Sequence, residues 1–480
     1  MFFVNYFINK NAYAEGGTTM KIKSILLPAV MSLSLFGLIS LTGCFGGQPE
    51  EEASIDINVN EDIKAIENLQ NKVKEKSVAL QKMQQDLKVK KASNKAPSSE
   101  VKKLEQEIAA QQKEVVQASK QVAVVKAEKG KYVSSMFRMV SSHDMYTGYN
   151  IPPPLDFKWK FKAIAGFKGS PVMDAEHIYI GSTDSNLYSL DKTSGMVSWK
   201  TQVLGPISST PALYGGTLYV GTDAGNFYAI NAKDGQVKWT KKIGAEVKGS
   251  SPAIAGGVVI VGVSDLNGMT EGKVVALNRA TGALLWEKKV GVSVFSSPCA
   301  ANGLVYIGAS DNNLYAFNPD SGGIAWQYIT GAGVNSSPAE SDGILVFGSD
   351  DKKVYAVDSL NGTVKWAFPT EGYIMAGAIK DGVFFCGSKG KSVYAISLDT
   401  GKLIWKLPVE YSVLSAPLII NNLLYIAAGK EFMALDTKTG EKKWSTLYDS
   451  RIECSPIAED GVIYFGDLES NFYALESSAK

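Results

Sequence analysis

Side chains able to bind a metal or act as nucleophiles are few in this chain. It has two histidines, His143 and His177, and its cysteines lie far apart in the sequence, with no Cys-x-x-Cys and no adjacent pair. This argues against a dithiol redox centre, a c-type haem and a histidine-built metal site. Residues 387–392 end like a phosphate-binding loop, but Phe385 stands where that motif requires its first glycine. We therefore predict no catalytic residue, no metal and no cofactor.

One cysteine, Cys44, lies in a sequence context that predicts a covalent modification. The basic residues Lys21 and Lys23 precede an apolar run over 25–39, which ends in Leu41-Thr42-Gly43-Cys44. This order is typical of a secretion signal and is too short for a comfortable membrane span. The stretch resembles a bacterial lipobox, in which the cysteine thiol receives a diacylglycerol. We predict that 20–43 is a lipoprotein signal peptide and that Cys44 is lipidated.

The residues around this signal refine the expected location. Glu15-Gly16-Gly17 can be encoded by a purine-rich stretch of the ribosome-binding type, so we predict that Met20 is the true start and that 1–19 is a mis-assigned upstream extension. Phe45 follows the cysteine, where lipoproteins retained in the inner membrane carry Asp. The expected location is the cell envelope, with a lipid anchor in the outer membrane and the protein facing the periplasm.

The sequence of residues 44–156 predicts a tether, a helical hairpin and a linker. Residues 44–62 contain acidic side chains and no basic one, as in a solvated tether. Apolar residues then recur at heptad spacing in two runs within 63–128, separated by a helix-breaking stretch around Pro97. A coiled-coil α-helical hairpin is expected there, either as a spacer or as a surface for a partner or for self-association. A linker over 129–156 ends in three prolines and would be stiff.

The rest of the chain is organised by a repeat that contains all eight tryptophans. They are spaced by 40, 40, 47, 40, 40, 39 and 39 residues: Trp159, Trp199, Trp239, Trp286, Trp326, Trp366, Trp405 and Trp444. Each period holds four short β-rich runs separated by turn residues. A period near 40 with four strands is typical of propeller blades. We predict a mainly β fold, an eight-bladed β-propeller of four-stranded antiparallel blades over 157–476, preceded by the hairpin.

The two ends of the repeat region predict how the ring closes. The last unit stops after its third strand, whereas Trp159 and its strand precede the first complete unit. Residues 157–161 should therefore pair with 470–475 and complete the eighth blade, which removes an open edge. Most units open on a Ser-Pro or Thr-Pro step, and the sixth departs from this with Gly377-Ala378.

Two segments, 276–286 and 434–444, resemble the tryptophan-docking repeat of quinoprotein-type (PQQ-like) propellers. Together with the lipobox, eight such repeats resemble the BamB-like lipoproteins of the outer-membrane β-barrel assembly machinery. The resemblance implies that the tryptophans have a structural role and that a BamA-like outer-membrane barrel is a partner. The hairpin is a departure from that family. The enzymes of this fold use PQQ and Ca²⁺, and many carry a vicinal cysteine pair that this chain lacks.

One unit carries an insertion at 264–272, which accounts for the 47-residue step. Loops on a rigid scaffold often carry recognition, so Leu266, Asn267 and Met269 are a candidate partner loop, although a harmless long hairpin is the simpler interpretation. The 480 residues carry 49 Lys and Arg against 48 Asp and Glu, which argues against nucleic acid as a partner.

The resulting hypothesis is a non-enzymatic, lipid-anchored envelope scaffold that binds proteins through its propeller. A ligand-binding or sensory surface lipoprotein is the alternative, and a PQQ-dependent dehydrogenase is a third.

Overall fold

A computed structural model describes residues 75–76, 79–80, 82–87, 90–91, 98–129, 150–244, 246–264, 271–291 and 293–479, and within 98–129 it describes the side chains of 99–114. The predicted signal peptide, Cys44, the acidic tether and the loop residues Leu266, Asn267 and Met269 lie outside this part of the chain. No helix within the described residues is long and apolar enough to cross a membrane.

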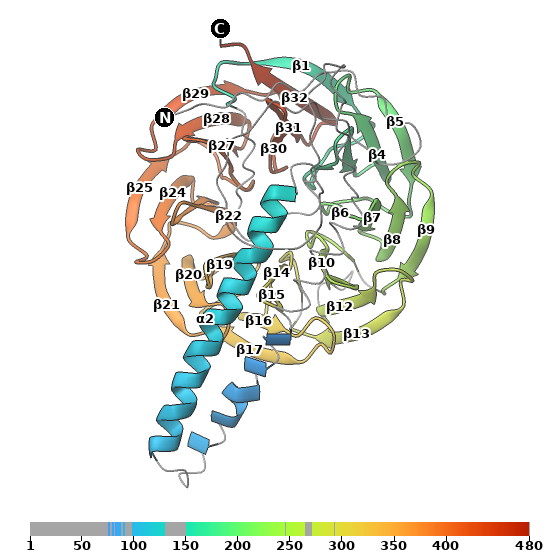
Figure 1. The fold of residues 1–480 in the computed structure, drawn as a ribbon. Helices are drawn as coiled ribbons and strands as arrows, with labels where there is room; N and C mark the ends of the chain where they lie inside the picture. The colour runs from blue at the N-terminus through green and yellow to red at the C-terminus, as the bar shows by residue number, and fades with distance from the viewer. Residues whose placement is uncertain are drawn as a thin grey trace, which may run out of the picture. The chain divides into compact units, whose positions relative to one another are not determined.

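The strands form eight separate four-stranded antiparallel sheets arranged in a ring (Figure 1). Blade 1 contains β2 (Val172–Met173), β3 (His177–Gly181), β4 (Asn186–Asp191) and β5 (Val197–Gln202). Blade 2 contains β6 (Ala212–Tyr214), β7 (Thr217–Gly221), β8 (Asn226–Asn231) and β9 (Val237–Lys242). Blade 3 contains β10 (Ala253–Ala255), β11 (Val258–Val263), β12 (Lys273–Asn278) and β13 (Leu284–Lys289). Blade 4 contains β14 (Cys299–Ala301), β15 (Leu304–Gly308), β16 (Asn313–Phe317) and β17 (Ile324–Ile329).

The second half of the ring repeats this order. Blade 5 contains β18 (Ala339–Ser341), β19 (Ile344–Ser349), β20 (Lys353–Asp358) and β21 (Val364–Pro369). Blade 6 contains β22 (Ile374–Lys380), β23 (Val383–Ser388), β24 (Ser392–Ser397) and β25 (Leu403–Pro408). Blade 7 contains β26 (Leu418–Ile420), β27 (Leu423–Ala428), β28 (Glu431–Asp436) and β29 (Lys442–Leu447). Blade 8 contains β30 (Ile457–Glu459), β31 (Val462–Gly466), β32 (Asn471–Ser477) and β1 (Leu155–Lys162).

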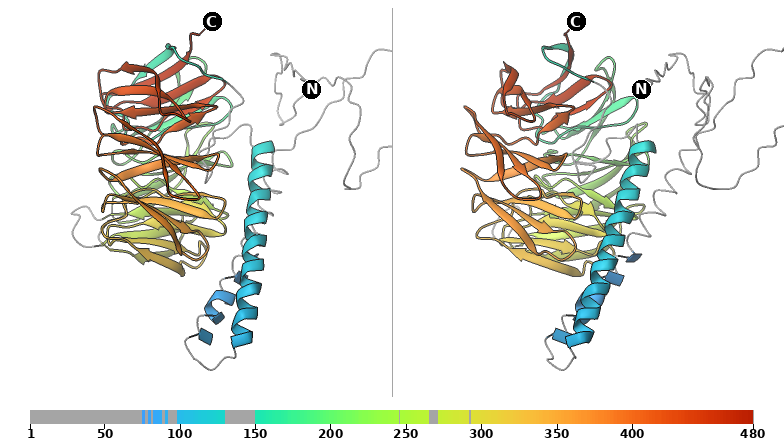
Figure 2. Two further views of the ribbon diagram at one scale, coloured as in Figure 1. Left: turned by 90° about the vertical axis from the view of Figure 1, so that its left-hand side faces the viewer. Right: turned by 60° about the vertical axis from the view of Figure 1, so that its left-hand side comes forward.

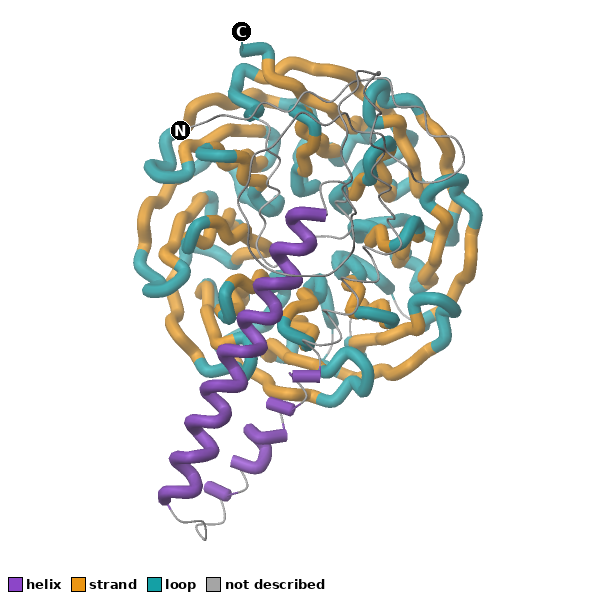
Figure 3. The backbone as a smooth tube through the Cα atoms, viewed as in Figure 1, coloured by secondary structure: helices purple, strands orange, loops and turns teal. Residues whose placement is uncertain are grey.

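The hydrophobic core lies between the blades. The second and third strands are apolar on both faces, and all six residues of β11 are buried. One cluster joins residues of β11 and β12 to residues of β15 and β16 in the next blade, including Ile260, Ala276, Ile307 and Phe317. The outer strands instead alternate exposed and half-buried residues, as expected for strands with one solvated face. Each outer strand therefore ends its sheet and lies on the wall of the ring (Figures 2 and 3).

The predicted ring closure is confirmed. Strand β1 pairs antiparallel with β32, so that Phe157 is opposite Leu475 and Phe161 is opposite Phe472. The strand begins at Leu155, two residues before the predicted boundary. One strand from before the repeats thus completes the blade that the end of the chain leaves open.

A buried lysine joins blade 8 to blade 1, the first blade of the ring. The ammonium of Lys192 in blade 1 lies 2.5 Å from a carboxylate oxygen of Glu459 and 3.0 Å from one of Asp460, both in blade 8. The Lys192 side chain is only 9% exposed. A charge buried to this extent is tolerated because it is paired.

Among the described residues before the propeller, 98–129 form a long helix, α2 (Ser98–Lys129). Short helical stretches between residues 75 and 91 lie beside it. Lys76 contacts Glu114 at 2.7 Å and Lys91 contacts Glu105 at 2.8 Å. These pairs run in opposite sequence directions, as antiparallel arms would, but much of the predicted first arm lies outside the described residues.

Candidate functional site

The repeated tryptophans join each outer strand to the following blade. In seven of them the indole N–H donates a hydrogen bond to a backbone carbonyl in the turn before the next outer strand. The donor and acceptor residues are Trp159 and Lys192, Trp199 and Ala232, Trp239 and Arg279, Trp286 and Pro319, Trp326 and Ser359, Trp366 and Leu398, and Trp405 and Thr437, at 2.7 to 3.1 Å.

A glycine in the same turn lies flat against each of these indoles. Gly440 has φ of +72°, and a Cβ on it would lie 2.7 Å from the ring of Trp405. Trp444 faces blade 8, in which the last two strands, β32 and β1, come from opposite ends of the chain and share no such turn. Its ring lies edge-on to Phe432 with the ring centroids 6.4 Å apart. The geometry assigns the other seven tryptophans to blade docking.

A second contact between blades runs around the centre of the ring. The hydroxyl of the Ser-Pro or Thr-Pro step accepts a hydrogen bond from the equivalent backbone N–H of the preceding blade. Six such bonds of 2.8 to 3.0 Å link Ser170 N–H to Thr210, Thr210 N–H to Ser251, Ser251 N–H to Ser297, Ser297 N–H to Ser337, Ala416 N–H to Ser455, and Ser455 N–H to Ser170. The hydroxyls of these steps are thus used to hold the ring together.

This ring of hydroxyls is interrupted at blade 6. There Gly377 replaces the serine, and Ser337 N–H donates instead to the carbonyl of Met375 at 2.9 Å. The next blade carries Ala416, which has no hydroxyl to offer blade 6. The departure noted in the sequence therefore marks the place where the inner hydrogen-bond ring is broken.

The cysteines of the propeller lie in different blades and do not form a pair. Cys454 occupies the position that serine holds in several other blades, and burial raises the pKa of its thiol to about 12. Cys386 is also buried, and Cys299 is half-buried. A buried thiol held in its protonated form is a packing group rather than a nucleophile.

Aspartates in the turns that follow the second strands of several blades mostly bond within those turns. Asp184 and Asp311 accept hydrogen bonds from the hydroxyls of Tyr188 and Tyr315, each at 2.7 Å. Burial opposes ionisation of Asp184, but hydrogen bonds from Tyr188 and Asn186 outweigh it and hold the pKa of Asp184 below its usual value. Both carboxylates thus serve the turns in which they lie.

Asp223 and Asp350 lie in the corresponding turns of blades 2 and 5, but they have different hydrogen-bond partners. In blade 5 the tyrosine-bonded residue is Asp351, whereas Asp350 accepts a hydrogen bond from Asn335 at 2.7 Å. Asp223 likewise accepts one from Ser208 at 2.7 Å. Burial raises the pKa of both Asp223 and Asp350.

The donor groups of these turns do not fit a quinone with its calcium ion. Within the described residues, no three His, Cys, Asp or Glu side chains lie close enough together to hold a metal. Asp223 and Asp350 each bond to a neutral neighbour, and no described cysteine pairs with another.

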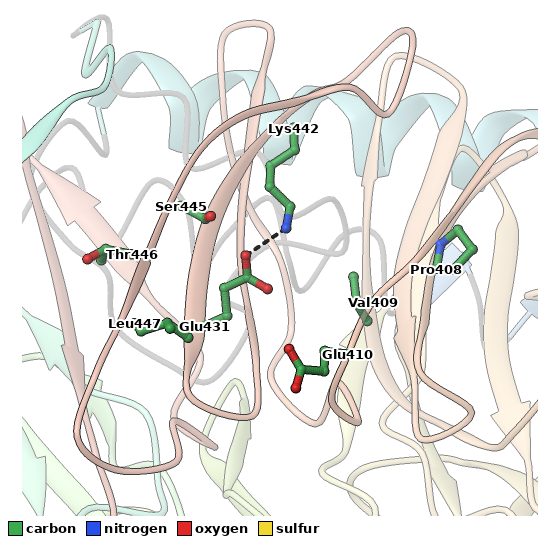
Figure 4. Close-up of a pocket in the computed structure, with 8 residues that line it drawn as sticks. All are labelled: Pro408, Val409, Glu410, Glu431, Lys442, Ser445, Thr446 and Leu447. Carbon is green, nitrogen blue, oxygen red and sulfur yellow. Dashed lines mark hydrogen bonds and ion pairs between the residues drawn. The ribbon is translucent and has the colours of Figure 1, made fainter.

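A groove of about 770 Å³ lies between the outer parts of blades 6 and 7 (Figure 4). Its lining comes from the end of β25 and from β28 and β29: Pro408, Val409, Glu410, Glu431, Lys442, Ser445, Thr446 and Leu447. Lys442 and Glu431 pair with each other at 2.6 Å across it. This groove was not foreseen from the sequence, because residues from two blades build it.

The outer strands differ in how their free edges are protected. Lysine or proline on an exposed edge strand discourages the addition of another strand. Seven of the eight outer strands carry at least one of these residues, and β21 and β25 carry both. Strand β17, with the sequence IAWQYI, carries neither and has no charged residue. The sequence contained this signal, but only the sheet order shows that β17 has a free edge.

Comparisons with known proteins agree with this architecture. The family model described as outer membrane protein assembly factor BamB matches residues 92–201, 118–289, 247–373 and 368–480. Among solved structures, BamB from Moraxella catarrhalis matches with a TM-score of 0.60 and 15% identity, covering 68% of this chain and 99% of that one. A comparison with curated proteins gave no match.

Other solved structures share the fold but differ in what their names state. A europium-containing methanol dehydrogenase matches with a TM-score of 0.60 and 15% identity, over 71% of this chain and 98% of that one. The computationally designed Ika8 protein matches with a TM-score of 0.58 and 16% identity, over 65% and 96%. At such identities the structures speak for the fold alone, whereas the family model spans most of the chain. The chain therefore belongs to the family described as outer membrane protein assembly factor BamB.

Proposed function

We propose that the protein is a non-enzymatic scaffold of the cell envelope, anchored by lipid at Cys44, that binds protein partners through its propeller. In the version that its family suggests, it assists the assembly of outer-membrane β-barrels together with a BamA-like barrel. The cysteines, tryptophans and ring hydroxyls of the propeller serve its own packing. What the ring offers a partner is its surface.

The observation that carries this proposal is the unprotected edge of β17. Its outward side chains are Ala325, Gln327 and Ile329, and Ile329 is 66% exposed. An extended segment of a partner can add to such an edge through main-chain hydrogen bonds. Barrel proteins before and during assembly offer extended strands with alternating side chains, so their chemistry matches the edge.

The helical hairpin over 63–128 serves in this proposal as a spacer between the tether and the ring, or as a second surface for a partner. The loop at 264–272 joins β11 to β12, and its residues Leu266, Asn267 and Met269 remain a candidate contact in addition to β17.

Crosslinking in native membranes followed by purification of the lipidated protein tests the proposal. A BamA-like barrel among the main crosslinked proteins would support an assembly role. Recovery of the protein without any partner would contradict the scaffold role. If a labelled lipid precursor is not incorporated at Cys44, the lipid anchor is contradicted. Dye reduction that depends on added PQQ and Ca²⁺ would contradict the non-enzymatic assignment.

A further inference from the structure

The wall of the ring has an uneven distribution of charge. Strands β1, β5 and β9 are the outer strands of the three neighbouring blades 8, 1 and 2 (Figure 1). Alternate residues of each strand point outward, about 6.6 Å apart along it. The nine outward residues are Lys158, Lys160, Lys162, Ser198, Lys200, Gln202, Lys238, Thr240 and Lys242. Six are lysines and none is acidic, and we call these three strands the lysine wall.

The opposite part of the ring lacks this charge. The outward residues of β17, β21 and β25 are Ala325, Gln327, Ile329, Lys365, Ala367, Pro369, Ile404, Lys406 and Pro408. Only two of these are lysines, and Lys406 pairs with Glu371 at 2.5 Å. Every outer strand except β17 carries a lysine, but the outward lysines are concentrated on β1, β5 and β9.

Most of the charge on the lysine wall is not neutralised by the propeller. Lys158 has a long contact of 3.8 Å with Glu476, and Lys160 lies 5.1 Å from the centre of the Tyr473 ring. Lys162 and Lys200 have no ion-pair partner within the described residues, and both are exposed. The lysine wall therefore has a positive electrostatic potential, which attracts an anionic surface.

Exposed apolar side chains lie beside these lysines. Ile164 follows β1 and is 82% exposed, and Leu204 follows β5 and is 69% exposed. Both occupy equivalent places in the connections that lead to the next blade. Large apolar side chains next to a lysine cluster are typical of surfaces that lie against a membrane, where the cations meet head groups and the apolar groups enter the interface.

We propose that the lysine wall docks the propeller onto an anionic lipid surface, with Ile164 and Leu204 entering the interface. The inference rests on the lipid anchoring in the proposed function, which would hold the ring close enough to a bilayer for weak contacts to add up. Each lysine near an anionic surface strengthens binding by about fivefold. Docking through blades 8, 1 and 2 would leave β17, on the far side of the ring, open to partners.

Lysine footprinting on the full chain tests this surface whatever the anchor contributes. The protein is reconstituted into vesicles of phosphatidylcholine alone or of phosphatidylcholine with an equal amount of phosphatidylglycerol. A water-soluble succinimidyl ester then acylates accessible lysines, and mass spectrometry gives the rate at each site. On anionic vesicles we expect Lys160, Lys162 and Lys200 to react severalfold more slowly than on neutral ones, while Lys365 and Lys402 keep their rates. High salt should abolish this protection, because it screens the charges.

Charge reversal provides a matched pair of variants. The double variant Lys162→Glu/Lys200→Glu should lose the protection of Lys160 and Lys242 on anionic vesicles. The control Lys365→Glu/Lys402→Glu should keep it. All four sites are exposed, so both variants should melt at the wild-type temperature.

Equal reaction rates on the two vesicle types would overturn the inference. Protection in native membranes but not on protein-free vesicles would also overturn it and would assign the wall to an acidic protein. Protection of the wall without any crosslinked envelope partner would contradict the proposed scaffold and leave the docking surface standing.

Discussion

Two glycines with nearly the same φ distinguish the cost of backbone strain from the cost of a steric clash when a side chain is added. Gly382 has φ of +73° and open space around a Cβ, whereas Gly440 has φ of +72° and the Trp405 ring at 2.7 Å. Gly382→Ala should lose about 1 kcal/mol of unfolding free energy from backbone strain. Gly440→Ala should lose about 2–4 kcal/mol, because the indole must also move. Denaturant unfolding of the two variants measures this, and equal losses would contradict a tight docking of glycine on tryptophan.

The thiol of Cys454 gives a prediction about pH. Because burial raises its pKa to about 12 from an ordinary 9.0, the folded protein keeps this proton at pH values where the unfolded chain loses it. The stabilisation is therefore complete below pH 9 and is lost as the pH rises towards 12. At pH 8 we expect iodoacetamide to modify Cys299 and to leave Cys454 unmodified until denaturant is added. Rapid labelling of Cys454 in the folded protein would contradict its assignment as a packing group.

At the scale of secondary-structure elements, the hydroxyl ring couples neighbouring blades. Thr210 is 2% exposed and accepts the Ser170 N–H. Thr210→Val keeps the shape but leaves that buried N–H without an acceptor, which should cost about 1–3 kcal/mol. Thr240→Val, on the exposed face of β9, is the matched control and should change stability by less than about 0.5 kcal/mol. If the two variants unfold at the same denaturant concentration, the ring of hydroxyls contributes nothing to stability.

The fold was largely predictable because its determinants repeat along the chain. The spacing of the tryptophans gave eight blades, and the position of Trp159 before the first unit gave the closure that β1 and β32 form. The Ser-Pro steps were visible in the sequence, but the role of their hydroxyls was not, since the partner of each hydroxyl lies in a neighbouring blade.

The surface was less predictable than the core, for a physical reason. A strand becomes an exposed edge only through the order of strands in its sheet. The composition of β17 therefore indicates an unprotected edge only once that order is known. The lysine wall arises in the same way, because β1 precedes the repeats in sequence but stands next to β5 in the ring.

At the scale of the whole molecule, the seam between blades 8 and 1 is where the ring should open first. Lys192→Met leaves Glu459 and Asp460 without their buried counter-ion and should cost about 3 kcal/mol. We expect a lower melting temperature and faster hydrogen exchange in β1 and β32 than in β15 and β16. Uniform exchange across all blades would contradict a weak point at the seam.

The same ring would carry two surfaces with different tasks. The lysine wall on blades 8, 1 and 2 faces away from blade 4, where β17 has its unprotected edge. A scaffold that is docked by one side and binds by the other can hold a partner strand near a bilayer without any chemistry of its own.

Site-specific photo-crosslinking at Gln327 tests this account most directly. Gln327 follows Trp326 on β17, and Ala367 follows Trp366 at the equivalent place on β21, where Lys365 and Pro369 protect the edge. With a photoreactive residue at each site in turn, in native membranes, we predict that position 327 captures a BamA-like or other barrel protein and that position 367 does not. Equal capture at both positions, or none at 327 while the protein is folded and anchored, would contradict the claim that this propeller is a scaffold acting through β17.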